Sequence, residues 1–235
     1  MFYQTLAHHG VLFLDELSEF QRSSLEALRQ PLEDGFVTIV RGQRALSFPT
    51  RFILVAATNP CPCGYAGVGD RCRCGETDFR RHRRRLSGPL LDRLDLMVNV
   101  QRPTETELSA PPVTTSALAS QRVAEARSRQ EARLAASAAR CNGEMDGREV
   151  RRFARLDDEA QELLRKAYAV GTLSARGRHR MARLARTVAD LDGAETVRGE
   201  HVLTALGLRQ RVGDDDHDAA VAGYPEELSG ASWPT

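Results

Sequence analysis

The sequence predicts an α/β unit followed by an all-helical unit. Two short runs rich in β-branched and aromatic residues, residues 10–14 and 52–57, are typical of strands buried in a parallel sheet. From about residue 117 onward, apolar residues instead recur at the spacing of helices. Between the two parts, residues 102–116 contain paired prolines and have the composition of a linker.

Composition places the chain among globular proteins. Its 235 residues are 41% hydrophobic and 28% charged, with a formal net charge of +1, which suffices for one large domain or two small ones. No apolar run is long enough to span a membrane, and the first residues do not resemble a signal peptide. Four of the five cysteines fall within residues 61–74, which favours a reducing compartment with metal-bound or free thiols. We therefore expect a cytoplasmic protein with no membrane partner.

Two acidic residues, Asp15 and Glu16, directly follow the first predicted strand. Ligands of open α/β sheets bind at the carboxyl ends of the strands. Carboxylates at that position suit Mg²⁺, which prefers hard oxygen ligands and keeps several waters. The alternative is the start of a helix, where acids lie near the positive end of the helix dipole.

A helix and a hairpin are expected between the two strands. Ser18 is predicted to cap a helix that runs to about Leu32, buries Leu25 and Leu28, and ends at Asp34-Gly35. Residues 36–40 and 45–48 then alternate as the two strands of a β-hairpin. Arg41 and Arg44 flank its turn, so the hairpin has a basic tip.

The second buried strand, residues 52–57, is followed by Asn59. An amide at the end of a strand beside Asp15 and Glu16 can orient a water molecule or a γ-phosphate. Asn59 is equally compatible with a simple turn residue before Pro60.

Cysteines and arginines fill the next segment. Cys61, Cys63, Cys72 and Cys74 form two C-x-C pairs, whose four thiolates can surround one tetrahedral Zn²⁺. The alternative is a glycine-rich loop of free cysteines. Residues 78–86 are predicted to form an arginine-rich helix, which either is a solvated face or contacts phosphates through residues such as Arg80 and Arg81.

Arg93 lies between two acids, just before a predicted last strand at residues 97–100. Its guanidinium can be held rigid and directed at a neighbouring molecule. The alternative is an intramolecular ion pair with Asp92 or Asp95.

Four helices are predicted after the linker: residues 117–139, residues 157–170, a helix capped by Ser174, and residues 198–208. In the third, one buried stripe is expected, formed by Met181, Leu184, Val188 and Leu191. Such a small helical bundle after an α/β layer indicates a lid. The acidic segment from about residue 213 is predicted to be disordered.

Several stretches together resemble one family, the Mg-chelatase-like AAA+ ATPases of the ComM/YifB kind. They occur in the family's order: residues 6–17 (LAHHGVLFLDEL), 56–61 (AATNPC), 87–95 (SGPLLDRLD), 173–180 (LSARGRHR) and 185–191 (ARTVADL). The resemblance spans roughly residues 6–211. It implies a partial AAA+ P-loop core with a parallel sheet and a hairpin insertion, followed by an all-α lid domain.

The resemblance also implies roles for individual residues. Asp15 and Glu16 would be the Walker B acids, with Asp15 holding Mg²⁺ and Glu16 activating water. Asn59 would be sensor 1. Arg93 would be the arginine finger, which acts on the ATP of the next subunit. Arg176, at the start of the lid helix, would be sensor 2 and contact ATP.

Two neighbours, Arg180 and Arg183, are alternatives for sensor 2. The hairpin around residues 41–44 would be the insertion that faces the central channel in related ring helicases. The arginines at the tip of this hairpin, together with Arg80 and Arg81, would then be candidates for contact with single-stranded or branched DNA.

The family's members form homo-hexamers. Those like ComM drive branch migration of DNA, whereas relatives in the chelatase branch power metal insertion into a porphyrin. The expected domains are residues 1–103 for the partial ATPase core, 104–116 for the linker, 117–211 for the lid and 212–235 for the acidic tail.

The sequence departs from the family in one important way: it contains no Walker A loop of the form G-x-x-x-x-G-K-[ST]. The family's amino-terminal Lon-protease-like domain is also missing. Without the loop's amides and lysine, most of the contacts that bind the β- and γ-phosphates are absent. We therefore expect no ATP hydrolysis by this chain alone. Alternatives are a chelatase subunit, a non-enzymatic remnant and a zinc-loop nucleic-acid binder.

Overall fold

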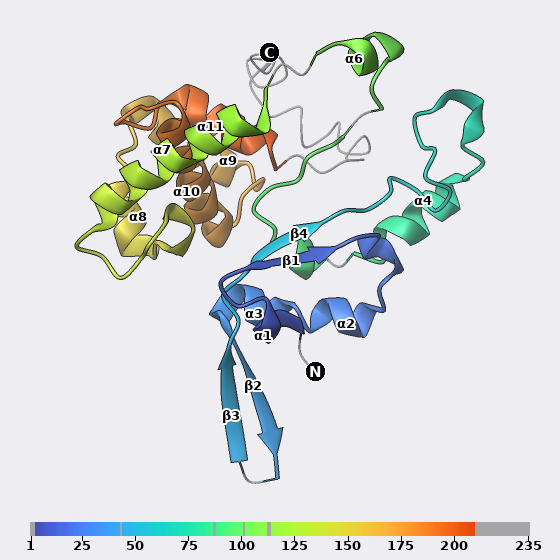
Figure 1. Cartoon of the computed structure of the whole chain (residues 1–235), viewed down its shortest axis with the longest axis horizontal. Helices are drawn as coiled ribbons and strands as arrows, with labels where there is room; N and C mark the ends of the chain where they lie inside the picture. The colour runs from blue at the N-terminus through green and yellow to red at the C-terminus, as the bar shows by residue number, and fades with distance from the viewer. Residues whose placement is uncertain (1–2, 43, 87, 101, 112–113, 210–235) are drawn as a thin grey trace. The chain divides into compact units, whose positions relative to one another are not determined.

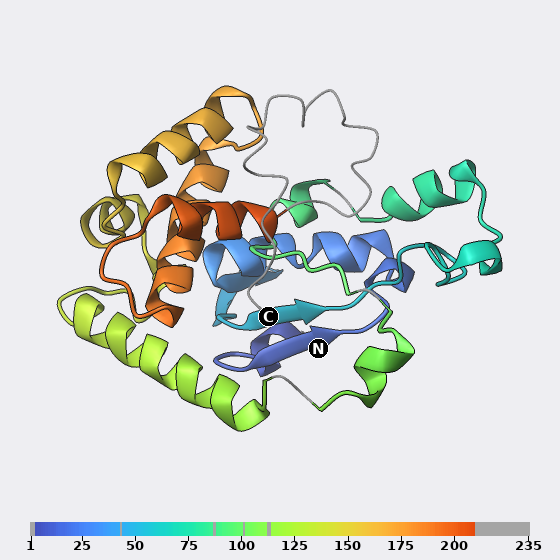
Figure 2. The same cartoon turned by 90° about the horizontal axis from the view of Figure 1, so that it is seen from above.

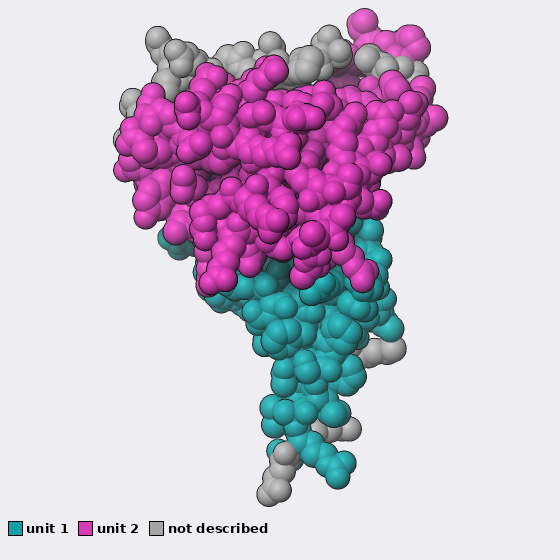
Figure 3. All heavy atoms as spheres, turned by 90° about the vertical axis from the view of Figure 1, so that its left-hand side faces the viewer, with its two compact units in different colours: residues 1–94 teal, residues 95–235 magenta. Residues whose placement is uncertain are grey.

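A computed structural model describes residues 3–42, 44–86, 88–100, 102–111 and 114–209 of the chain. The chain divides into two compact units, residues 1–94 and residues 95–235 (Figure 3). The first unit combines strands with short helices, and the second is mostly helical (Figure 1). The predicted order, an α/β part followed by a helical part, is confirmed.

The first unit contains a two-stranded parallel sheet. Strand β1 (Val11–Leu14) pairs with β4 (Ile53–Ala56), in a register that runs from Val11 opposite Ile53 to Leu14 opposite Ala56. Figures 1 and 2 both show the two strands side by side. Parallel pairing brings the carboxyl ends of both strands to the same edge, as the sequence predicts.

Helices pack against one face of this sheet. Leu12 and Leu14 of β1 lie against a buried cluster, made of Leu17, Leu25, Leu28 and Leu90. On the other face, Phe13 is 60% exposed and Ile53 is 57% exposed. The prediction of strands buried on both faces is therefore wrong for this structure. Successive side chains of a strand point to opposite faces, and the helical cluster covers only one.

The predicted helix between residues 18 and 32 is broken into three pieces. These are a 3₁₀ turn, η1 (Leu17–Glu19), and two helices, α2 (Arg22–Glu26) and α3 (Arg29–Asp34). Gln21, not Ser18, lies at the N-cap of α2. Pro31 has no N–H to donate, so it fits the first turn of α3 but not the interior of one long helix. Gly35 ends α3 with a φ of 71°, as expected for a glycine after a helix.

The hairpin is confirmed as β2 (Phe36–Arg41) and β3 (Arg44–Pro49), which pair antiparallel. It projects from the rest of the first unit (Figure 1). All of β3 is exposed, including Leu46 at 53%. The two strands are therefore held together mainly by the backbone hydrogen bonds between them.

The first unit also contains α1 (Tyr3–Leu6), η2 (Gly69–Arg71), α4 (Glu76–Arg83) and α5 (Gly88–Leu91). Helix α4 confirms the predicted arginine-rich helix. The strand predicted at residues 97–100 is wrong, because these residues adopt no regular structure. Val98 and Val100 are 65% and 86% exposed. The Met97 N–H instead donates to the Leu208 carbonyl at 2.7 Å, so residue 97 has a helix end as its partner.

The second unit begins with α6 (Glu105–Ser109), a short helix inside the predicted linker. Its Thr104 and Glu107 form a capping box, in which each side chain accepts the other residue's N–H. The remaining elements are α7 (Ser116–Leu134), η3 (Asn142–Glu144), α8 (Gly147–Phe153), α9 (Asp158–Ala169), α10 (Ala175–Leu191) and α11 (Gly199–Gly207). Among the residues described, no helix has both the length and the apolar character needed to cross a membrane.

Helix α10 is the centre of the helical unit, and its buried face is formed by residues that differ from those predicted. Met181 is fully buried, but Leu184, Val188 and Leu191 are only partly buried. Alanines form much of the buried face, namely Ala182, Ala185 and Ala189. Small residues let the neighbouring helices approach α10 closely. The acidic tail predicted for residues 212–235 lies outside the described residues.

Two charged residues of α10 lie in the core. Arg186 and Asp190 are both 0% exposed and pair at 3.1 Å, one helical turn apart. Arg133 of α7 donates to both carboxylate oxygens of Asp190, at 2.6 and 2.7 Å. Asn142 donates to the same carboxylate at 2.8 Å. This network joins α7, η3 and α10, and the apolar periodicity of the sequence gave no sign of it.

Candidate functional site

The structure places Asp15 and Glu16 at the carboxyl edge of the sheet. Both follow β1 directly and both are exposed. Two hydrogen bonds flank them: the Ala57 N–H donates to the Leu14 carbonyl at 2.9 Å, and the Leu17 N–H donates to the Ala57 carbonyl at 2.8 Å. The two acids are thereby held beside the end of β4.

Glu16 has an unusual backbone conformation. Its φ of 50° and ψ of 48° lie in the left-handed region, which costs a non-glycine residue roughly 1 kcal/mol or more. The Glu16 N–H donates to the Asp15 carboxylate at 2.9 Å. The flanking hydrogen bonds to β4 hold the chain in this strained turn. Strain of this kind is concentrated at functional sites.

Asn59 lies three residues after β4 and is exposed. Its backbone carbonyl accepts a hydrogen bond from Nε2 of His82, at 2.8 Å. His82 belongs to α4 and is 7% exposed, so this bond ties the end of β4 to the arginine-rich helix. Sequence reasoning missed His82, because one histidine among arginines gives no periodic signal.

This edge of the sheet fits a Mg²⁺ ion better than it fits a whole nucleotide. The Asp15 and Glu16 carboxylates and the Asn59 amide all offer hard oxygen donors. The phosphates of ATP need amide and lysine donors that the sequence does not supply at this edge.

Arg93 is tied within the first unit. It forms an ion pair with Glu33 of α3 and donates from Nη1 to the Pro89 carbonyl at 2.6 Å. The expected alternative partners were Asp92 and Asp95, so the ion pair with Glu33 is new. The Arg93 side chain is 17% exposed, and these contacts hold its guanidinium in place.

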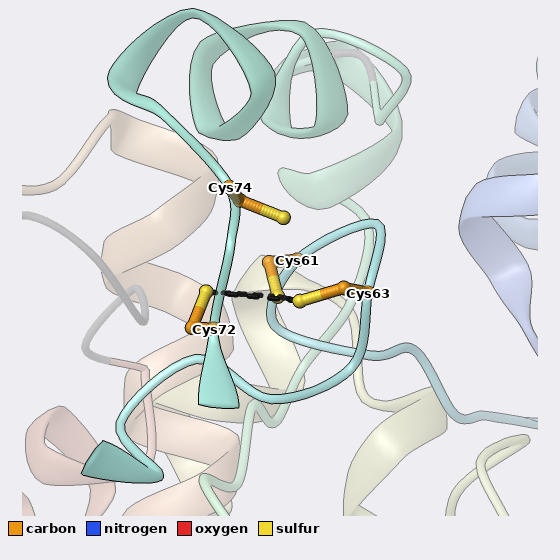
Figure 4. A group of neighbouring side chains, drawn as sticks. All are labelled: Cys61, Cys63, Cys72 and Cys74. Atoms are coloured by element: carbon orange, nitrogen blue, oxygen red, sulfur yellow. Dashed lines mark hydrogen bonds between the residues drawn. The ribbon is translucent and has the colours of Figure 1, made fainter. Parts of the chain in front are cut away.

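The four clustered cysteines converge on one point (Figure 4). The Sγ atoms of Cys61, Cys63, Cys72 and Cys74 all lie within 4.8 Å of one another. The Tyr65 backbone N–H, followed by the Cys61 thiol, lowers the pKa of Cys63 to about 6.

Arginines surround a hollow of about 400 Å³ in the first unit. Arg81, Arg84 and Arg85 come from α4 and the turn that follows it, and Arg22 comes from α2. Arg85 donates to the Ser18 carbonyl at 3.0 Å and pairs with Glu19 at 2.9 Å. Sequence reasoning named Arg81 but not Arg22, which only the fold brings close.

The other basic candidates lie apart from this hollow. Arg80 is exposed and pairs with Glu76 along α4, at 2.5 Å. Arg41 and Arg44 face each other across the last pair of the hairpin register, and Arg44 is exposed. The hairpin tip therefore presents at least one accessible cation.

The arginines of α10 differ in their surroundings. Arg176 lies in the first turn and is exposed. Arg180 pairs with Asp95 at 3.0 Å. Arg183 donates to the carbonyls of Gly143 and Met145, and burial lowers its pKa. Arg183 thus has a structural contact within the helical unit.

Comparison with known proteins matches both parts of the chain. The family model described as magnesium chelatase, subunit ChlI, matches residues 4–108. The model of the ChlI C-terminal part matches residues 113–209. The chain belongs to the Mg-chelatase-like family. Members of this family generally depend on ATP and Mg²⁺.

Individual relatives carry the names ComM and YifB. The chain is 40% identical over 210 residues to competence protein ComM of Haemophilus influenzae, and 40% identical over 207 residues to the uncharacterised protein YifB of Escherichia coli. It is 43% identical over 204 residues to an uncharacterised protein of Mycobacterium tuberculosis. These matches cover 87–88% of the chain but only 40% of each relative.

Proposed function

We propose that this Mg-chelatase-like chain is the Walker B, sensor and lid portion of a hexameric ATPase that remodels branched or single-stranded DNA. The observation that carries the proposal is the shared edge of β1 and β4. Two hydrogen bonds hold Asp15 and Glu16 there, beside the strand end that leads to Asn59. A metal-binding acid, a water-activating acid and a polar sensor are the groups that such hydrolysis requires.

Each residue has a defined task in this proposal. Mg²⁺, when bound, neutralises charge on the phosphates of ATP. Asp15 holds the metal through a carboxylate oxygen, and Glu16 accepts a proton from the attacking water. Asn59 orients that water. Arg93 and Arg176 supply positive charge to phosphates, with Arg93 serving the neighbouring subunit.

The basic hollow supports the DNA half of the proposal. Phosphate contacts from arginine and lysine supply most of the affinity of nucleic-acid binding. The hollow brings arginines of α2 and α4 together, and the hairpin tip adds Arg44. The Haemophilus influenzae relative is named a competence protein, which agrees with a role in DNA uptake.

A chimera tests the ATPase proposal. This chain would replace the matched 210-residue region of Haemophilus influenzae ComM, which leaves the rest of that protein to supply the missing residues. We expect ATP hydrolysis that DNA stimulates. Glu16→Gln should abolish hydrolysis while nucleotide binding persists, and Glu131→Gln, at an exposed position of α7, is the matched control. A Glu16→Gln chimera that hydrolyses ATP at the unmodified rate would refute the assignment.

The DNA proposal can be tested on the chain itself by fluorescence anisotropy with forked and single-stranded DNA. Arg81→Ala combined with Arg84→Ala should weaken binding and reduce its salt dependence. The pair Arg151→Ala and Arg152→Ala, on α8 of the helical unit, removes the same charge elsewhere. Equal losses in the two double variants would show that only net charge matters.

A second candidate is a subunit that drives metal insertion into a tetrapyrrole. The descriptions of both family models, which name a magnesium chelatase subunit, favour it. The two candidates predict different stimulation of the chimera: DNA raises the ATPase rate in the first, and a porphyrin-binding partner raises it in the second.

A further inference from the structure

The spacing of the four cysteine sulfurs matches the geometry of one bound metal ion. In a tetrahedral site with Zn–S bonds of about 2.3 Å, neighbouring sulfurs lie about 3.8 Å apart. The Cys61 sulfur lies 3.4 Å from that of Cys63 and 3.9 Å from that of Cys72, and the Cys63 and Cys72 sulfurs are 3.7 Å apart. The Cys74 sulfur lies within 4.8 Å of the other three.

Disulfide bonds do not explain this cluster. A disulfide needs its two sulfurs about 2.05 Å apart, and all four cysteines are free thiols. One of the four thiols is fully buried and three are half-buried. Without a metal ion, their close approach would stabilise the fold little, because thiols form only weak hydrogen bonds. The backbone between the pairs favours such convergence, since Gly64 and Gly67 adopt φ values of 77° and 78°.

We propose that Cys61, Cys63, Cys72 and Cys74 bind one Zn²⁺ as a closed structural site. Four thiolates complete the tetrahedral coordination and leave no position for substrate, as in structural zinc sites. The site does not depend on the ATPase or DNA proposals, because it follows from sulfur geometry alone.

The zinc site would connect two functional segments. Cys61 lies two residues after Asn59, and Cys74 directly precedes Gly75, the N-cap of α4. The metal therefore fixes the start of the arginine-rich helix relative to the end of β4. The hydrogen bond from His82 to the Asn59 carbonyl is a second connection between the same segments. Loss of zinc should loosen Asn59 and α4 together.

Metal content is the first test. The chain, purified under reducing conditions, should contain one zinc per molecule by plasma mass spectrometry. Replacement by Co²⁺ should give the absorption bands of a tetrahedral tetrathiolate complex. Cys74→Ser should lose the metal or change this spectrum. Cys141→Ser, which removes the one cysteine outside the cluster, should change neither.

Hydrogen exchange is the second test, and it needs no variant. On removal of zinc by a chelator, exchange should accelerate in residues 57–60 and 76–83, and zinc should restore protection. Absence of both zinc and a cobalt thiolate spectrum in the wild-type chain would overturn the proposal. So would a Cys74→Ser variant that binds Co²⁺ with the wild-type spectrum.

Discussion

The buried ion network of the helical unit allows a quantitative prediction. Asp190 is 1% exposed in its side chain and accepts charged hydrogen bonds from Arg133, with Arg186 at 3.1 Å. Asp190→Asn removes the negative charge and leaves two guanidinium groups in the core without their counter-ion. Removing one partner of a buried pair typically costs about 3–5 kcal/mol. We expect a loss of that size in the helical unit.

The assay should report on the helical unit alone, because the two units need not unfold together. Hydrogen exchange in increasing urea, read from peptides of α10 by mass spectrometry, gives the free energy of opening there. The matched control is Asp192→Asn, two residues further along. Asp192 lies 4.0 Å from Arg122 and 3.5 Å from Nε2 of His201. Its side chain is 50% exposed, so the change should cost about 1 kcal/mol or less.

Comparing the losses in opening free energy of the two variants shows whether the buried network stabilises the core. If Asp190→Asn costs no more than Asp192→Asn, the network does not stabilise the core and the reasoning fails. A double variant, Asp190→Ala with Arg186→Ala, adds a further check. It should cost clearly less than the sum of the two single variants, because each removes a partner of the other.

Three more predictions concern a cap, a carboxylate and the whole chain. Ser174→Ala removes the hydroxyl that accepts the Gly177 N–H at 3.0 Å. The free energy of opening of α10, measured by hydrogen exchange, should therefore fall by about 1 kcal/mol. The control Ser116→Ala, which changes no cap, should have little effect. The Ser137 hydroxyl lowers the pKa of Glu149 below 4.5, so this stabilisation is present above that pH and lost as pH falls through the lower folded pKa. Protection of α8 should decline in that acidic range, and Glu149→Gln should flatten the decline; an identical profile in both proteins would contradict the assignment. Finally, residues 1–235 alone should release no phosphate from ATP with Mg²⁺ in a malachite-green assay, because the sequence lacks a phosphate-binding loop, and steady release would refute this.

Local signals explain most of what the sequence predicted correctly. Ser174 caps its helix through its own side chain, as predicted, and such caps depend on a few neighbouring residues. The hairpin and the glycine that ends α3 are equally local. Asp15 and Glu16 could be placed at a sheet edge because they directly follow a short run of β-branched and aromatic residues.

Features that depend on distant partners were not predicted. Residues 97–100 have the composition of a strand, but a strand needs a partner to complete its hydrogen bonds. The apolar pattern of α10 does not mark Arg186 and Asp190 as buried, because their partners in the core, Arg133 and Asn142, come from other segments. Arg22 joins the arginine hollow only through the path of α2. In each case the missing information lay in another segment of the chain.

The pairing of β1 with β4 has a consequence for the order of folding. The two strands are separated in sequence by α2, α3 and the whole hairpin, so their contact closes a long loop. The hairpin closes only a tight turn and can form earlier. We therefore expect the parallel pair to form late and to open early. Asp15, Glu16 and Asn59 would then come together only when nearly everything between them has folded, so that an incompletely folded chain has no assembled metal site.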